Sequence, residues 1–148
     1  MRCKILSISD SDKHFASACA EYEKRMGKLV GISSVAPVRH GTQDQIIEKE
    51  TEVIRKLLDK EKNAFRILLS KEGVSKTTEQ FAEVLHAHPE VVFVIGWPYG
   101  LDESQLGAVV DMRISLWNHT MPHGLAKLVL LEQIYRVSMI DQGRTYHY

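Results

Sequence analysis

The sequence lacks several features that mark whole classes of protein. Cysteine occurs only twice in 148 residues, at Cys3 and Cys19, which is too few for a disulfide framework and gives no metal-ligand spacing. No apolar run approaches the roughly 18–20 residues that a membrane span needs. The apolar stretch behind Arg2 and Lys4 is too short for a signal peptide. We therefore expect a cytoplasmic protein without a membrane segment, whose cysteines pack as small apolar residues.

An excess of either charge is lacking too. The chain has 19 Lys and Arg against 19 Asp and Glu, so its formal net charge is zero. A neutral chain has no overall attraction to nucleic acid, and it also lacks the repulsion that keeps copies apart. Its 44% apolar and 26% charged residues are typical of a globular protein. The length falls within the range of about 100–200 residues for one domain, so we expect a single domain over residues 1–148 that self-associates.

Short apolar runs alternate with longer segments of helical periodicity. This alternation predicts an α/β fold with a mainly parallel sheet flanked by helices. The run Val91–Ile95 has no polar interruption, which is typical of a parallel strand buried on both faces, whereas Lys4–Ser9 alternates and predicts a half-buried strand. The expected strands are residues 4–9, 30–35, 65–69, 91–95 and 112–116, and the expected helices lie near residues 15–26, 46–58, 78–88, 102–110 and 123–140.

Polar residues mark where several of these helices begin. Asp10 or Ser11 is expected to cap the first helix, and Asp102 the fourth. Thr77 followed by Gln80 has the spacing of a capping box. These signals place the helix starts directly after the preceding strands or loops.

Three loops leave the carboxyl ends of predicted strands, after Leu69, Ile95 and Leu116. Ligands of parallel α/β sheets bind at such ends, so we expect the three loops to line one site. The second loop, Gly96 to Gly100, allows positive φ and a close approach of the backbone to a ligand. Its glycine spacing is neither that of a dinucleotide fingerprint nor that of a P-loop, and an ordinary strand-to-helix turn is the alternative.

The last third of the chain concentrates unusual side chains. His119 and His123 lie four residues apart, but Pro122 keeps them from sharing one helical face and no third ligand is evident, so we expect no metal. The helix over residues 123–140 is apolar around most of its circumference, which fits either a central core helix or one that also packs on a partner subunit. The tail, residues 144–148, carries Tyr146, His147 and Tyr148 and either docks into a site or is pinned on its own core.

Several segments together resemble the RlmH family, formerly called YbeA. The matching words are Phe93-Val94-Ile95-Gly96, Pro98-Tyr99-Gly100-Leu101, Pro122-His123-Gly124-Leu125-Ala126 and Leu130-Leu131-Glu132-Gln133-Ile134-Tyr135-Arg136, together with Tyr146-His147 at the end and Ala20 to Met26 in the first helix. The resemblance spans nearly the whole chain. It implies a SPOUT-class methyltransferase with a C-terminal trefoil knot, acting as a homodimer.

The resemblance also implies an activity and a cofactor site. Family members transfer the methyl group of S-adenosylmethionine to N3 of a pseudouridine in the 23S rRNA of assembled ribosomes. Carried over by position, the cofactor-binding residues are Leu69, Gly96, Leu116, Trp117, Asn118, His119, Thr120 and Met121.

The chain departs from the family pattern at two places. Trp97 replaces a usual second glycine, and residues 117–119 differ from the family's stretch. A non-catalytic ribosome- or RNA-binding dimer that has lost cofactor use is therefore the competing interpretation. A small-molecule enzyme that uses the same pocket is a third.

Methyl transfer to N3 requires that the proton on this atom be removed, and histidine is the natural base because its unperturbed pKa is near 6.5. His123 lies beside the predicted cofactor loop, and His147 lies on the tail. We expect His147 to act as base with Tyr146 on the substrate side, and Arg144 or Lys127 to contact phosphate. The alternative for His123 is that it caps the last helix.

Overall fold

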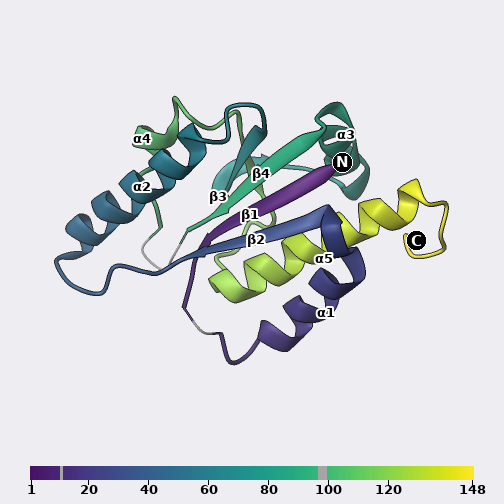
Figure 1. Cartoon of the computed structure of the whole chain (residues 1–148), viewed down its shortest axis with the longest axis horizontal. Coiled ribbons are helices and arrows are strands. Elements are labelled where there is room, and N and C mark those ends of the chain that lie inside the picture. The colour runs from purple at the N-terminus through teal and green to yellow at the C-terminus, as the bar shows by residue number, and fades with distance from the viewer. Residues whose placement is uncertain (11, 97–99) are drawn as a thin grey trace.

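The protein is built on one five-stranded sheet. The computed structural model describes residues 1–10, 12–96 and 100–148 (Figure 1). The strands lie in the order β2-β1-β4-β3-β5, and every neighbouring pair is parallel, which confirms the predicted α/β sheet. The strands are β1 (Arg2–Ile8), β2 (Val30–Val35), β3 (Phe65–Ser75), β4 (Glu90–Ile95) and β5 (Met112–Ser115).

Helices cover both faces of the sheet, and the molecule has three layers (Figure 1). Side chains of α1, α3 and α5 pack in one core cluster, and those of α2 and α4 pack in the other. The helices are α1 (Ala16–Met26), α2 (Gln43–Asp59), α3 (Thr78–Ala87), α4 (Glu103–Leu106) and α5 (His123–Asp141), with a short 3-10 turn η1 (Gly27–Leu29) after α1.

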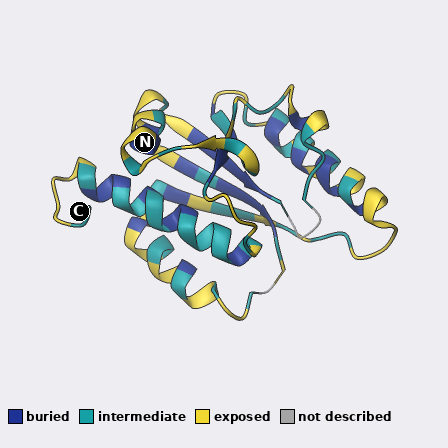
Figure 2. Cartoon of the chain, turned by 180° about the vertical axis from the view of Figure 1, so that it is seen from behind, coloured by how far each residue is buried: buried dark blue, intermediate teal, exposed yellow. Residues whose placement is uncertain are grey.

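Strand β4 divides its side chains between the two cores, as its unbroken apolar run predicts. Phe93 and Ile95 enter the core under α1, α3 and α5, while Val92 and Val94 enter the other. Strand β1 behaves in the same way, so the prediction that it is half-buried was wrong (Figure 2). The reason is its position between β2 and β4, with a layer of helices over each face.

The helix starts agree only partly with the predicted caps. Thr77 and Gln80 form the capping box of α3, and the side chain of Asp102 caps α4, although α4 ends at Leu106 rather than near Val110. The prediction that Asp10 caps the first helix was wrong, because α1 begins only at Ala16. Asp12 instead accepts hydrogen bonds from the backbone N–H groups of His14 and Phe15 in a turn before the helix. The alternative cap, Ser11, lies outside the described residues.

Strand β3 is longer than predicted. The sequence predicts that it ends at Leu69 and that residues 70–75 form a loop, but the strand continues to Ser75. Leu69 and Val74 both pair with Ile114 of β5, so the residues between them bulge while the chain stays on the same neighbour. The prediction failed because the partner of this segment lies some 40 residues further along the chain, where local pattern carries no signal.

Gly73 is the point of closest approach between β3 and β5. A Cβ atom at this position would lie 2.6 Å from the carbonyl carbon of Ile114 and 2.7 Å from that of Arg113. We expect Gly73→Ala to lower the free energy of unfolding by about 1–3 kcal/mol or more, because backbone atoms cannot rotate away as a side chain can. The midpoint of denaturant unfolding measures this loss.

Gly31 offers a matched control for that substitution. It lies in β2, and a Cβ atom there would meet no atom within 4 Å. Gly31→Ala should therefore leave the unfolding midpoint almost unchanged. Equal stabilities for the two variants would show that β3 and β5 do not approach each other in this way in solution.

Candidate active site

A cavity of about 780 Å³ opens beside the bulge of β3 and at the carboxyl ends of β4 and β5. All three predicted loops contribute to its wall, so the expectation that they converge on one place is confirmed in geometry. From the first come Leu69 to Glu72, from the second Gly96, Gly100 and Leu101, and from the third Leu116, Trp117 and His119 to His123. Parallel sheets present such crevices to their ligands at this end.

The wall of the cavity combines many apolar side chains with a few polar ones. Leu69, Ile95, Leu116, Met121 and Ala126 supply apolar surface. Among the described residues of the wall, the ionisable side chains are Lys71, Glu72, Glu103, His119 and His123. Small-molecule sites have this mixture and typically occupy about 300–1,000 Å³.

Gly96 and Gly100 form one side of the cavity, and glycine serves a different purpose at each. Gly100 has a φ of +78°, which other residues rarely adopt, so the predicted positive φ is found there. Gly96 has no such φ; a Cβ atom on it would lie 3.3 Å from Cγ of Leu101 and 3.6 Å from the backbone of Gly100. Glycine at 96 thus allows Gly100 and Leu101 to approach the end of β4 closely. Trp97, Pro98 and Tyr99 lie outside the described residues.

The loop after β5 forms the rim. Ser115 Oγ donates a hydrogen bond to the carbonyl oxygen of Trp117 at 2.9 Å, which fixes the start of the loop. Of the residues predicted to wrap a cofactor, Leu116, Trp117, His119, Thr120 and Met121 all line the cavity. Asn118 is exposed and is not among the described residues of the wall.

His123 stands at the point where α5 meets the cavity. It is the first residue of α5, and the N-cap position belongs to Pro122, so the alternative that His123 caps this helix was wrong. The carboxylate of Asp12 lies against the start of α5, because a Cβ atom on Gly124 would overlap its Oδ2. A negative charge at this end of a helix interacts favourably with the helix dipole.

The environment of Asp12 keeps its carboxyl group ionised. Burial opposes ionisation, but the backbone hydrogen bonds from His14 and Phe15 and the charge of His123 outweigh it and lower the pKa of Asp12. Asp12 therefore faces the first turn of α5 as a carboxylate, and it acts electrostatically on His123 in the cavity wall.

The tail after α5 is folded back on its own chain. The hydroxyl of Tyr146 lies 3.3 Å from that of Tyr22 and 3.3 Å from Glu132 Oε1, and its ring packs edge-on against Tyr135. Burial, together with Tyr22 and the charge of Glu132, raises the pKa of Tyr146, so its phenol stays protonated. Within one chain, the tail is therefore packed on its own core, which is one of the two alternatives that the sequence left open.

Two further predicted residues, His147 and Lys127, also have side-chain partners within the chain. His147 Nε2 lies 2.9 Å from Glu79 Oε1 at the start of α3. The carboxylate of Glu79 accepts hydrogen bonds from its own backbone N–H, from His147 and from Thr77. These lower the pKa of Glu79 to about 2, so this carboxylate is charged at neutral pH. Lys127 Nζ lies 3.0 Å from Glu23 and ties α5 to α1, while Arg144 is exposed.

The tail and the cavity lie at opposite ends of α5. Its 19 residues span about 28 Å at 1.5 Å per residue, with His123 at the cavity and the C-terminus beyond the far end (Figures 1 and 2). No residue of the tail is among the described residues of the cavity wall. The structure therefore brings His123 to the candidate cofactor residues within one chain, but it does not bring His147 or Tyr146 there.

Comparison with known proteins identifies the family. Residues 1–147 match the family described as "Predicted SPOUT methyltransferase". The chain is 32% identical to ribosomal RNA large subunit methyltransferase H of Lactobacillus gasseri and 35% identical to the protein of the same name from Clostridium beijerinckii, with 99% of both chains covered in each case. The chain belongs to the SPOUT methyltransferase family. The resemblance to the RlmH family is thereby confirmed.

A solved structure agrees with this SPOUT assignment at the level of the fold. The crystal structure of a proposed RNA methyltransferase from Bacillus anthracis superposes with a TM-score of 0.62 at 13% identity, covering 99% of each chain. At that identity, the likeness concerns the arrangement of the chain alone.

Sequence reasoning missed several residues that shape the site of this SPOUT methyltransferase. Asp12 reaches the start of α5 from a distant segment, and no spacing in the sequence signals this contact. Leu101 and Ser115 also line the cavity, each next to a residue that was predicted. In the described part of the chain, no group of three or more His, Cys, Asp or Glu side chains is placed to hold a metal ion. None of the described helices is long and apolar enough to cross a membrane.

Proposed function

We propose that this protein uses S-adenosylmethionine to methylate N3 of a pseudouridine in 23S rRNA within the assembled ribosome. The observation that carries the proposal is the cavity beside the bulge of β3 and the ends of β4 and β5, in a chain of the SPOUT methyltransferase family. The name of the relatives, ribosomal RNA large subunit methyltransferase H, supports rRNA as the substrate and the cytoplasm as the place of action. Pseudouridine and its N3 atom follow from the resemblance to the RlmH family.

The residues of the cavity fit the proposed cofactor. S-adenosylmethionine combines a flat apolar base with a polar ribose and a charged amino-acid part, and the wall combines apolar side chains with a few charged ones. Leu69, Gly96 and the backbone of residues 116–121 would hold it. When bound, the cofactor supplies an electrophilic methyl group.

The side chains of the protein then have to hold the target base and remove its proton. His123 is the one of the two predicted bases that lies in the cavity wall, and the carboxylate of Asp12 lies against the first turn of its helix. Positioning both reactants in one cavity converts an encounter in solution into an effectively unimolecular step.

The predicted use of His147 and Tyr146 requires a second copy of the chain. Because the tail lies at the far end of α5 from its own cavity, it can act at a cavity only if that cavity belongs to a partner. Helix α5 has half-buried apolar side chains for such an interface, among them Leu125, Leu128 and Val129. A stable interface buries at least about 1,000 Å² in total. We therefore propose a homodimer with composite sites.

The competing function is a dimer that binds ribosomes without catalysis. The departure of Trp117, Asn118 and His119 from the family pattern is the observation in its favour. The cavity that the same loop lines remains open to a ligand of suitable size, which favours catalysis.

Methyl transfer measured from isotopically labelled cofactor tests the proposal. We expect label to enter 23S rRNA when assembled ribosomes from cells lacking the activity are supplied, and mass spectrometry of nuclease fragments should place it on one pseudouridine. Free rRNA should accept far less. Ribosomes that co-sediment with the protein but gain no label would instead establish the non-catalytic dimer.

A further inference from the structure

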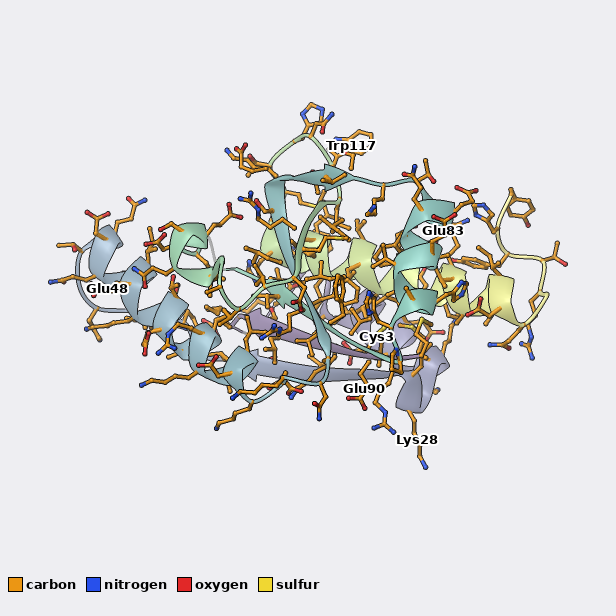
Figure 3. The ribbon with its side chains drawn as sticks, turned by 90° about the horizontal axis from the view of Figure 1, so that it is seen from above. Cys3, Lys28, Glu48, Glu83, Glu90 and Trp117 are labelled. Atoms are coloured by element: carbon orange, nitrogen blue, oxygen red, sulfur yellow. The ribbon has the colours of Figure 1, made fainter. Side chains whose placement is uncertain are left out.

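Trp117 is unusually exposed for its residue type. It lies on the rim of the cavity, yet it is 61% accessible to solvent. Figure 3 shows its ring on the outer side of the loop, pointing away from the sheet. Tryptophan supplies a large apolar face, and at the mouth of a cavity that face is available for contact with a ligand.

The indole does not stand alone. The ring of His119 stacks beside it, with centroids 5.9 Å apart and planes inclined by 27°. The hydrogen bond from Ser115 to the carbonyl of Trp117 fixes the backbone beneath the pair. The indole, with the imidazole stacked against it, forms an aromatic platform at the mouth of the cavity, and most of the indole surface is open.

A nucleobase is the ligand that suits such a platform. An enzyme that modifies a base must take this base out of its stack, and the neighbouring base then loses a stacking partner. Stacking on an aromatic side chain replaces that lost contact and contributes about 1–3 kcal/mol per base.

We propose that Trp117, supported by His119, stacks against an RNA base that flanks the target nucleotide. The inference rests on the proposed function for its substrate class, RNA. It divides the loop after β5 into two parts: the backbone of residues 116–121 faces the cofactor, and the side chain of Trp117 faces the RNA. Trp117 is then a residue for substrate recognition.

A protein partner would use the surface differently. Val74, which is 62% exposed, lies in β3 where it pairs with Ile114, close to the start of the same loop, and is not among the described residues of the cavity wall. A second copy or another protein docked on this edge would cover Val74 as well as Trp117. A base stacked at the cavity mouth would contact Trp117 and leave Val74 free.

The test compares Trp117→Ala, Trp117→Phe and the matched control Val74→Ala. For Trp117→Ala we expect both the KM for ribosomes and the Kd of ribosome co-sedimentation to rise about 5- to 150-fold, which corresponds to about 1–3 kcal/mol. Trp117→Phe should restore most of the affinity because it keeps a ring. Val74→Ala should match the unchanged protein, and the Kd for S-adenosylhomocysteine, measured by calorimetry, should change less than threefold in all three.

Three results would overturn the inference. If Trp117→Ala weakens S-adenosylhomocysteine binding and spares ribosome binding, the indole belongs to the cofactor site. If Val74→Ala loses as much affinity as Trp117→Ala, or if Trp117→Ala produces monomers, the surface docks protein. Should the unchanged protein bind ribosomes without transferring methyl groups, the proposed function fails, while weaker co-sedimentation of Trp117→Ala would still support the stacking platform.

Discussion

Removal of Tyr146, His147 and Tyr148 is expected to abolish methyl transfer to ribosomes while S-adenosylhomocysteine still binds. The cavity is complete without the tail, because its wall runs from Leu68 to Ala126, so cofactor binding does not depend on these residues. The substrate side of a composite site does depend on them. Calorimetry and the ribosome assay measure the two effects separately.

His147→Ala isolates one side chain of the tail. If His147 accepts the N3 proton, the rate should fall about 10²- to 10⁴-fold. Glu79→Ala is the matched control, because it removes the acceptor that lies 2.9 Å from His147 but keeps the imidazole. A merely structural His147 would give the same loss in both variants, and that result would contradict the assignment.

The composite site also requires the dimer. Light scattering should give twice the chain mass of 16.9 kDa at micromolar concentration for the unchanged protein, for His147→Ala and for the tail deletion. A species of 16.9 kDa for the unchanged protein would exclude the composite site. A deletion variant that alone dissociates or melts would show that the contacts of Tyr146 with Tyr22 and Tyr135 are the main purpose of the tail.

Gly96→Val is expected to weaken S-adenosylhomocysteine binding by about 100-fold or more, since each tenfold loss requires only about 1.4 kcal/mol. The first added carbon would already lie 3.3 Å from Leu101, and the two methyl groups beyond it would have to displace this side chain, which itself lines the cavity, or the backbone of Gly100. Gly96→Ala should have a smaller effect because Leu101 can yield by a few tenths of an ångström.

Gly31→Val is the control for this substitution. It makes the same chemical change in a strand, where valine is favoured and no atom lies within 4 Å of the added Cβ. S-adenosylhomocysteine should bind this variant as it binds the unchanged protein. If Gly96→Val binds equally well, the cavity is not the cofactor site, and the competing ribosome-binding dimer gains support.

Much of the site could be predicted because its parts are local. The uninterrupted run Val91–Ile95 indicates a buried parallel strand, and the rule for parallel sheets then places the following loop at the ligand edge. Gly96 and Leu116 were placed in this way, whereas Leu69 lies at the bulge of β3 and not at its end. The trefoil knot stays a prediction of the family resemblance, because local periodicity contains no information about how a chain is threaded.

The parts that could not be predicted depend on contacts between distant residues. The second half of β3 is a strand only because Ile114 and Ser115 pair with it, and the tail is pinned only because Tyr22 and Glu79 lie where it returns. Asp12 looks like an ordinary loop residue until α5 is packed against it. Each of these depends on the assembled fold.

The pairing of β3 with β5 also bears on the order in which the molecule forms. Arg66 and Asp111 join the two strands through reciprocal backbone and side-chain hydrogen bonds across 45 residues of chain, and α3, β4 and α4 lie in between. The entropy of closing so long a loop must be overcome before this contact stabilises anything. During synthesis the cavity cannot exist until residues up to Ala126 have emerged, since residues 115–126 form its last wall. The proposed cofactor would therefore have no native pocket on a partly made chain, and its binding would stabilise only the folded domain.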